Sequence, residues 1–181
     1  MSLARLPEVI KSERLTMQRL CAEDADQVFY AYASKPEATR YMAWPTHESI
    51  KDTRAYLNYA LTAWDLGLDF SYSVKLKGTG RIIGGWGAIH EEGKIQFGYV
   101  LSPTHWGQGF ATEICRHMLP HLRALSGVFR IGTFVDAENV ASLRVLAKCG
   151  LVEEAYLPKW FRFINQGNVP KDCILFRLPL P

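Results

Sequence analysis

The segment from Tyr99 to Glu113 constrains the fold most, because an apolar stretch, a glycine turn and a helix start follow one another in it. Pro103 stops a strand, and Gly107 and Gly109 flank Gln108 before the helical pattern begins. The first N–H groups of a helix have no partner inside the helix, so such an end can bind an anion. Glycines leave room for backbone amides to close around a phosphate. The segment predicts a phosphate-binding turn, although two spaced glycines alone also occur in ordinary tight turns.

Two other phosphate-binding motifs are excluded by the sequence. A P-loop requires GxxxxGK followed by Ser or Thr, and the chain contains no such string. A dinucleotide-binding fold requires GxGxxG after the first strand of a parallel unit, whereas these glycines follow the fourth predicted strand.

The remaining periodicity predicts an α/β fold with a mainly antiparallel sheet. Segments 70–76, 81–90 and 94–101 have the character of strands, and short glycine-containing connections between them favour a meander. Further strands are expected at 14–20, 130–135, 151–163 and 173–178. Helices are expected from Glu23 to Ala33, from a cap at Thr46 to Gly67, from 110 to 125 and at 139–149. We expect Pro120 to kink or shorten the third of these helices.

Composition favours one globular domain spanning residues 1–181, with 48% hydrophobic and 22% charged residues. A net charge of +3 without basic runs suits a small polyanionic ligand better than nucleic acid. Four separated cysteines and the histidines at 117 and 121 indicate neither a disulfide framework nor a metal site. No stretch is long and apolar enough for a membrane span, and no signal peptide is evident, so we expect a cytoplasmic protein.

The string Trp106-Gly107-Gln108-Gly109-Phe110-Ala111 resembles the acetyl-CoA signature of the GNAT superfamily of N-acetyltransferases, apart from Trp at its first position. The longer string to Glu113 is similar to the branch of ribosomal-protein N-terminal acetyltransferases (RimJ/RimL-like). Matches elsewhere extend over nearly the whole chain: Glu13-Arg14-Leu15, Ile83-Gly84, Gly98-Tyr99, Asp136, Asn139 to Ser142, and Cys149-Gly150-Leu151. The resemblance implies a GNAT fold, a mixed twisted sheet flanked by helices, with a V-shaped opening between the fourth and fifth predicted strands.

The resemblance also implies where acetyl-CoA binds as co-substrate. Backbone amides of five consecutive residues would hold the pyrophosphate: Gln108, Gly109, Phe110, Ala111 and Thr112. The strand edge at Val100 and Leu101 would pair with the pantetheine arm, and an amide near Leu101 would stabilise the oxyanion. Asn139 corresponds to the family's Asn that binds the arm, with a helix N-cap as the alternative.

Two catalytic positions of the family are altered here. Many members carry a Tyr four residues before the helix-ending glycine, where this chain has Leu146. In the RimJ/RimL-like branch a Ser or Cys at the position of Ser142 is thought to donate to the CoA sulfur, with a surface or capping hydroxyl as the alternative. Gln96 stands where the branch often has an acid, so the general base is not identified. Glu91, Glu92 or His90 could act remotely, although exposed turn charge is the better explanation of the Glu91-Glu92 pair.

Acceptor contacts are expected from the irregular segments 41–45 and 159–163, which combine aromatic with small or basic residues. We assign Tyr41, Trp44 and Trp160 to the acceptor groove together with Gln96; core packing under loops is the alternative. Trp86 and Trp106 are most simply packing residues.

The resulting prediction is an N-acetyltransferase that moves acetyl from acetyl-CoA to a primary amine, most simply a protein N-terminal α-amine, by direct attack in a ternary complex. A small-molecule acceptor, such as a polyamine, an aminoglycoside or an amino acid, is the first alternative, and an acid-lined groove would favour the polycations. A non-catalytic acyl-CoA-binding module is the second. No membrane or nucleic-acid partner is expected. The acceptor, the base, the acyl-chain preference and a homodimer are left open by the sequence.

Overall fold

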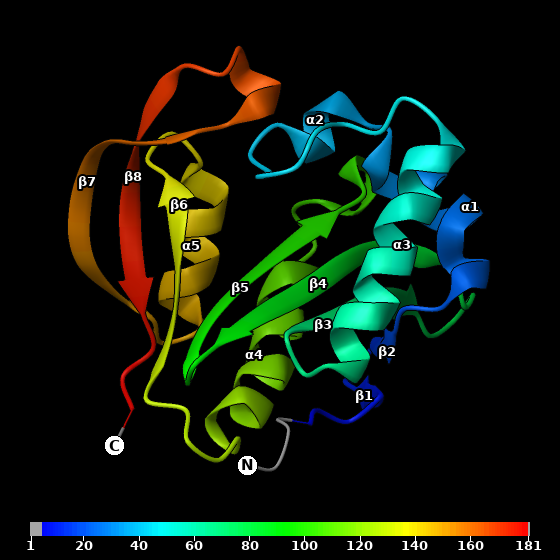
Figure 1. Ribbon diagram of the computed structural model, residues 1–181, viewed down its shortest axis with the longest axis horizontal. Helices are drawn as coiled ribbons and strands as arrows, with labels where there is room; N and C mark the ends of the chain where they lie inside the picture. The colour runs from blue at the N-terminus through cyan, green and yellow to red at the C-terminus, as the bar shows by residue number, and fades with distance from the viewer. Residues whose placement is uncertain (1–4, 181) are drawn as a thin grey trace.

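Eight strands form one sheet in the computed structural model, which describes residues 5–180 (Figure 1). The strand order is β1-β2-β3-β4-β5-β6-β8-β7, and every neighbouring pair is antiparallel except β5 and β6. The strands are β1 Val9–Lys11, β2 Leu15–Arg19, β3 Asp69–Leu76, β4 Ile82–Glu91, β5 Lys94–Leu101, β6 Arg130–Asp136, β7 Val152–Arg162 and β8 Pro170–Arg177. The expected mixed, mainly antiparallel sheet is confirmed, and the meander is β3-β4-β5.

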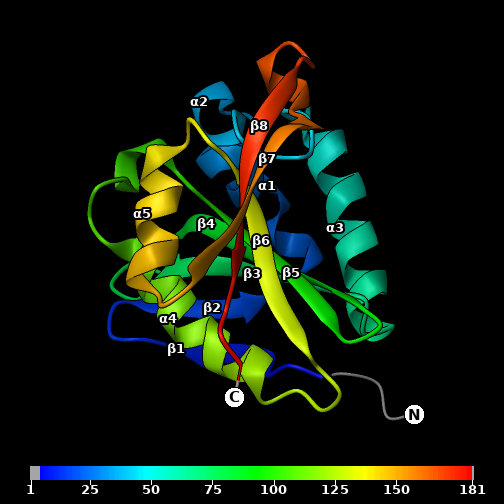
Figure 2. The same ribbon diagram turned by 90° about the vertical axis from the view of Figure 1, so that its left-hand side faces the viewer.

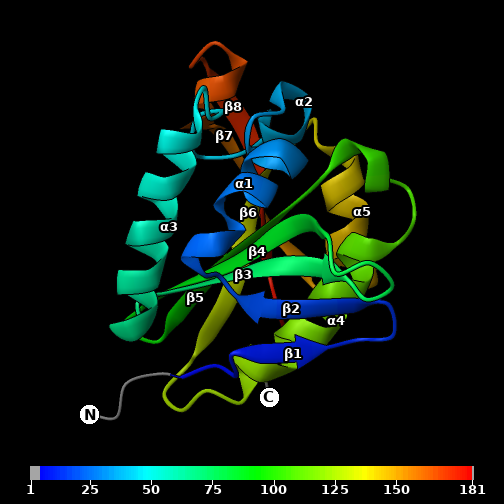
Figure 3. The same cartoon turned by 90° about the vertical axis from the view of Figure 1, so that its right-hand side faces the viewer.

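Helices cover both faces of this sheet. They are α1 Ala25–Val28, which continues into a π-helical turn at Phe29–Ala33, α2 Pro36–Thr39, α3 Ile50–Asp65, α4 Phe110–Arg123 and α5 Val140–Lys148. α4 and α5 lie on one side of the sheet and α1 and α3 on the other (Figures 2 and 3). None of the helices within residues 5–180 has the length and hydrophobicity needed to cross a membrane.

The expected cap of the helix predicted to end at Gly67 was wrong. Ser49, not Thr46, is the N-cap of α3, because its backbone is extended and its side chain forms a capping box with Asp52. Thr46 instead donates its amide to Asn165 of the β7–β8 connection. Pro120 does not shorten α4, which continues to Arg123.

Beyond Gln96, β5 and β6 separate. They pair in parallel only at Lys94, Ile95 and Gln96, opposite residues 130–132, and then diverge (Figure 1). β6 continues by pairing with β8, whereas β5 keeps only its β4 partner. This is the V-shaped opening expected between the fourth and fifth predicted strands, and it leaves one edge of β5 without a neighbouring strand.

The two faces of the meander carry different side chains because successive residues of a strand point to opposite sides. Phe70, Tyr72, Trp86 and Phe97 are buried on the α4 side; Trp86 forms an edge-on pair with Tyr72 and a stacked pair with Phe97. On the opposite face the middle of the same strands carries small residues: Ser71, Ser73, Gly85, Gly87 and Gly98. The packing of one face therefore fixes the sheet, and the other face has room for a cavity.

Candidate active site

A pocket of about 280 Å³ opens where β5 and β6 separate. Its walls come from β3, β4, β5, β6, α5 and the segment between α2 and α3. The lining includes three of the expected acceptor residues, three of the expected acetyl-CoA residues and several others: Tyr41, Trp44, Gln96, Val100, Asn139, Ser142, His47, Tyr56, Asp69, Ser71, Tyr99, Asp136 and Leu146. The pocket therefore joins the acceptor side to the pantetheine side of the predicted site, while residues 106–112 lie outside its lining.

A row of small residues forms the floor of the pocket. Ser71, Gly87 and Gly98 lie opposite one another on β3, β4 and β5. A Cβ built on Gly98 would have no heavy atom within 4 Å, and one on Gly87 would meet only the Ser71 Oγ, at 3.6 Å. Since two of these positions lack a side chain and Ser71 has a small one, the sheet face stays open from β3 to the free edge of β5.

Tyr99 and Ser142 meet across the opening. Tyr99 Oη and Ser142 Oγ are 2.8 Å apart, and either hydroxyl could be the donor. Burial raises the pKa of Tyr99 above its usual value, so its phenol stays protonated at neutral pH. The sequence indicated that Leu146, which lies on α5 and is buried in the core, occupies the usual Tyr position. It did not indicate that Tyr99 of β5 supplies a phenol instead. The alternation of residues along β5, which puts Tyr99 on the α5 side, was the available signal.

The free edge of β5 presents backbone amides to the opening. Ser102 N donates to Ile83 O, and the carbonyl of Val100 points at Gly84 of β4. In an antiparallel ladder the direction of the backbone groups alternates, so the N–H groups of Tyr99 and Leu101 face the other side. The ladder to β6 has already ended there. The side chain of Val100 lines the pocket, while that of Leu101 is buried outside the lining.

The glycine turn has the backbone conformation that only glycine adopts easily. Gly107 and Gly109 have φ values of 72° and 79°, and Gly109 is the N-cap of α4. Gly109 has no side chain to bond the first amides of α4, so the helix end is open to an anion. Trp106 is half exposed and donates its Nε1 to the carbonyl of Leu101 at 3.0 Å, which ties the turn to the end of β5. The expected packing role is confirmed for buried Trp86 and not for Trp106.

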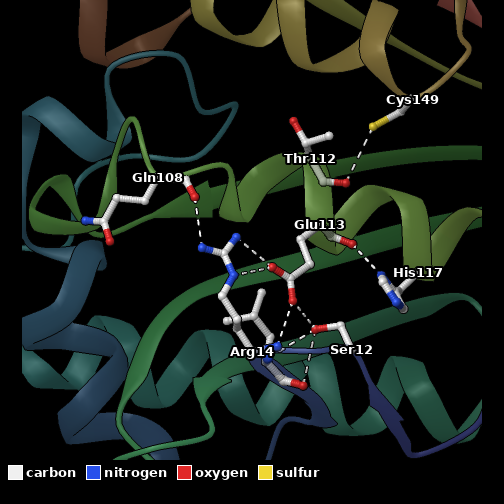
Figure 4. Close-up of polar contacts among 8 residues, drawn as sticks. Ser12, Arg14, Gln108, Thr112, Glu113, His117 and Cys149 are labelled. Atoms are coloured by element: carbon white, nitrogen blue, oxygen red, sulfur yellow. Dashed lines mark hydrogen bonds and ion pairs between the residues drawn. The ribbon is translucent and has the colours of Figure 1, made fainter.

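Arg14 holds this turn from below (Figure 4). Its guanidinium donates to Glu113 Oε2 at 2.7 Å and to the carbonyl of Gln108 at 3.0 Å, and it lies 4.2 Å from the centre of the Phe110 ring. Glu113 also accepts from the Ser12 hydroxyl and the Arg14 amide. Burial opposes ionisation of Glu113, but these hydrogen bonds and the Arg14 charge outweigh it and hold the pKa of Glu113 below its usual value.

Asn139 is the N-cap of α5, since its Oδ1 accepts from the amide of Ser142 at 3.2 Å. The capping alternative is thus confirmed, and because Asn139 also lines the pocket, its Nδ2 group stays available as a donor.

The cysteines do not form part of the pocket lining. Cys115 is fully buried, and Cys149 donates weakly to the carbonyl of Thr112.

The acceptor side of the pocket is acidic and aromatic. Asp69 and Asp136 line it, and no Lys or Arg within the described chain does. Tyr56 donates to Ser71 at 3.3 Å, and Ser71 donates to Asp69 Oδ1 at 2.9 Å. Burial raises the pKa of Asp69 and lowers that of His47. His47 is thereby held neutral.

Two contacts define the outer wall. Asn165 donates its Nδ2 to the carbonyls of Thr39 and Trp44, so the β7–β8 connection is fastened to the segment that carries Tyr41 and Trp44. Trp160 lies exposed on β7 and does not line the pocket. The structure thus brings together Tyr41, Trp44 and Gln96, and it leaves Trp160 outside.

No group of three or more His, Cys, Asp or Glu side chains that could hold a metal occurs among residues 5–180.

Comparison with known families gives a match to the acetyltransferase (GNAT) domain over residues 14–152. The uncharacterized N-acetyltransferase YoaA of Bacillus subtilis (strain 168) is 26% identical over 176 residues, which cover 96% of this chain and 97% of YoaA. The uncharacterized N-acetyltransferase p20 of Bacillus licheniformis is 31% identical over 153 residues, which cover 83% of this chain and 85% of p20.

Solved structures share the fold at lower identity. RimL, a ribosomal L7/L12 alpha-N-protein acetyltransferase solved with coenzyme A, superposes with a TM-score of 0.86 at 15% identity, covering 96% of this chain and 98% of RimL. The microcin C7 self-immunity acetyltransferase MccE, solved with acetyl-CoA and AMP, gives a TM-score of 0.84 at 19% identity, covering 95% of this chain and 96% of MccE.

Proposed function

The chain belongs to the GNAT acetyltransferase domain family, and on that premise we propose that it acetylates the α-amine of a protein N-terminus by direct attack on acetyl-CoA in a ternary complex. As a member of this family it is an acetyl-CoA-dependent N-acetyltransferase. One observation carries the assignment of its centre: the Tyr99–Ser142 hydroxyl pair and the unpaired edge of β5 meet in one pocket. The likeness to RimL, an alpha-N-protein acetyltransferase, supports the choice of acceptor.

The residues present fit acetyl-CoA. The left-handed glycines and free amides of the turn at 107–112 suit a pyrophosphate, and the amides on the free edge of β5 suit the carbonyl groups of a pantetheine arm. In this assignment Asn139 binds the arm through Nδ2, and the side chain of Val100 forms part of its wall. Trp106 acts indirectly, because it ties the turn to β5.

The chemistry required of the chain is modest. The neutral amine attacks the thioester carbonyl, the C–S bond breaks, and the amine loses one proton while the thiolate gains one. The Leu101 amide would hold the oxygen that becomes negative, an interaction worth about 3 kcal/mol in comparable sites. Ser142 would donate a proton or hydrogen bond to the sulfur, and Tyr99 would in turn donate a hydrogen bond to Ser142. Since the cysteines lie outside the lining, direct attack is favoured over an acyl-cysteine intermediate.

An α-amine suits a site whose fourth predicted strand carries Gln96 instead of an acid. With a pKa near 8, about a tenth of such an amine is already neutral at pH 7, whereas a lysine amine near 10.4 is neutral in only about one molecule in a few thousand. Water and backbone carbonyls can take the proton from the first kind of acceptor. The second kind would require a base.

The acidic pocket supports a second candidate, a small cationic amine such as a polyamine. Asp69 and Asp136 are the acidic residues of the lining, and no Lys or Arg among the described residues lines the pocket. In a chain whose net charge is +3, this local reversal favours a cationic acceptor.

The test is thiol release from acetyl-CoA across α-amino peptides, N-terminally blocked lysine peptides, polyamines and aminoglycosides. Turnover confined to α-amino peptides is expected. Turnover confined to polyamines would replace the acceptor, and acetyl-CoA binding without any turnover would favour a non-catalytic module. We place the reaction in the cytoplasm, where a reducing environment keeps four free thiols, and assign it to one domain spanning the chain.

A further inference from the structure

Asp69 is a buried carboxylate without a counter-ion. Its residue is 8% exposed, and it lines the pocket. Ser71 bonds to Oδ1, but no group within residues 5–180 hydrogen-bonds to Oδ2, and no Lys, Arg or His among them forms an ion pair with it. Burying a charge without a partner is costly, and the cost is recovered when a cation binds.

Asp136, the second carboxylate of the pocket, is different. Its Oδ1 accepts from the amide of Glu138 and its Oδ2 from Gln166 Nε2, each at 2.9 Å. Both of its oxygens therefore already have donors. Of the two carboxylates in this pocket, Asp69 is the one with an oxygen, Oδ2, that is still available to bind a ligand.

Aromatic rings line the pocket together with Asp69. The rings of Trp44 and His47 have centroids 5.2 Å apart, and Tyr56 follows at 6.3 Å from His47. Aromatic faces attract ammonium and guanidinium groups, and a carboxylate supplies the opposite charge. Burial keeps His47 neutral, so it adds no competing positive charge. This combination is suited to an organic cation.

The group bound at Asp69 and the nitrogen that is acetylated cannot be the same. Strands β3 and β5 are separated by β4, and with about 4.8 Å between neighbouring strands they lie about 10 Å apart. The thioester is expected at the far edge of β5. Asp69 is also level with Gln96 in the register, three residues before Tyr99 and five before Leu101 on β5, which adds about 10–17 Å along the strands. The open floor at Gly87 and Gly98 provides the path between them.

We propose that Asp69 binds a second positive charge of the acceptor, separate from the nitrogen that is acetylated. This inference rests on the proposed function, because that function puts the thioester beside β5. The acceptor is thus a compound with two cationic nitrogens. A protein terminus that carries a lysine close to its α-amine and an α,ω-diamine share this chemistry.

Calorimetry on the full chain saturated with CoA tests the proposal without turnover. The probes are α,ω-diamines of four to ten carbons against the monoamines of equal length, and peptides with lysine at position 1, 2 or 3 against the same peptides with norleucine there. We expect at least one dication to bind about tenfold more tightly than its monocation partner, as expected for one charge-assisted hydrogen bond. Asp69→Asn should reduce this preference below about twofold. Asp26→Asn, which removes an exposed carboxylate outside the pocket, should keep it.

The outcomes separate the two claims. Preference for the lysine peptide assigns the charge pair to a protein terminus, preference for the diamine assigns it to a small molecule, and either supports the proposal. Equal affinity of dication and monocation in the wild-type protein, or a preference that survives Asp69→Asn, overturns it. A lack of acetyl transfer to any acceptor contradicts the proposed function, and the binding preference then still decides the role of Asp69.

Discussion

Arg14, immediately before β2, donates from Nε to Oε2 of Glu113 in the first turn of α4, 2.7 Å away, although 99 positions separate them in the chain (Figure 4). The same guanidinium bonds the carbonyl of Gln108. The pair therefore connects the edge of the sheet to the turn that we assign to the pyrophosphate of acetyl-CoA.

Arg14→Met should raise the KM for acetyl-CoA about tenfold and change kcat by less than about threefold. The variant keeps a long apolar side chain against Phe110 but loses the donors that hold the turn, so binding should suffer more than the chemical step. Steady-state kinetics and calorimetry with acetyl-CoA measure the two effects.

Arg19→Met is the matched control, because Arg19, like Arg14, forms an ion pair and lies over an aromatic ring, but away from the turn. Its KM for acetyl-CoA should stay at the wild-type value. An equal increase in both variants would mean that loss of general stability, and not release of the turn, explains the effect.

Ser142→Ala should lower kcat about a hundredfold at saturating acetyl-CoA, and Tyr99→Phe about tenfold. Ser142→Ala removes the proposed donor to the leaving sulfur, and Tyr99→Phe removes the phenol that bonds to Ser142. The double variant should be little slower than Ser142→Ala, since the two hydroxyls act as one unit. Tyr59→Phe, at an exposed tyrosine of α3, is the control. Full turnover in Ser142→Ala would remove Ser142 from the mechanism.

Gly98→Ala and Gly84→Ala make the same change at two positions of one strand pair and should have opposite consequences. A Cβ at Gly84 would lie 2.3 Å from the carbonyl oxygen of Val100, so this variant should lose about 1–3 kcal/mol of stability. A Cβ at Gly98 meets nothing within 4 Å, so the melting temperature should change little while the methyl group narrows the pocket and raises the KM for the acceptor. Thermal unfolding and kinetics on both variants test this. An equal drop in melting temperature would mean that the floor is not open.

Asp69→Asn should stabilise the protein at neutral pH. Burial raises the pKa of Asp69 in the folded state, so the folded protein binds more protons than the unfolded chain between the two pKa values, and stability falls as pH rises through that window. At pH 7 the ionised group carries its full penalty, which asparagine lacks while still accepting the Ser71 hydrogen bond. Each kcal/mol recovered raises the melting temperature by about 2–4 °C. The gain should shrink below the folded-state pKa, and a lower melting temperature at pH 7 would contradict the prediction.

Local sequence patterns determined the order of most elements and the glycine turn. Turn residues and alternation act over a few positions, so the meander β3-β4-β5 and the start of α4 could be predicted without the rest of the chain. Short elements with little periodicity, such as β1 and α2, could not, and the α3 cap was placed three residues too early because Thr46 and Ser49 have similar capping propensity.

Only the tertiary structure decided which side chains share the pocket. Tyr99 meets Ser142, and Asp69 faces the opening. Strand register and the separation of β5 from β6 bring these three residues together, although Asp69 and Ser142 are 73 positions apart in the chain. The sequence shows each of these side chains but not its neighbours, so a vacant catalytic position at Leu146 could be identified while the phenol on β5 could not. Burial by distant segments likewise sets the pKa of Asp69 and leaves its carboxylate without a counter-ion, a property of the packed chain and not of any stretch of it.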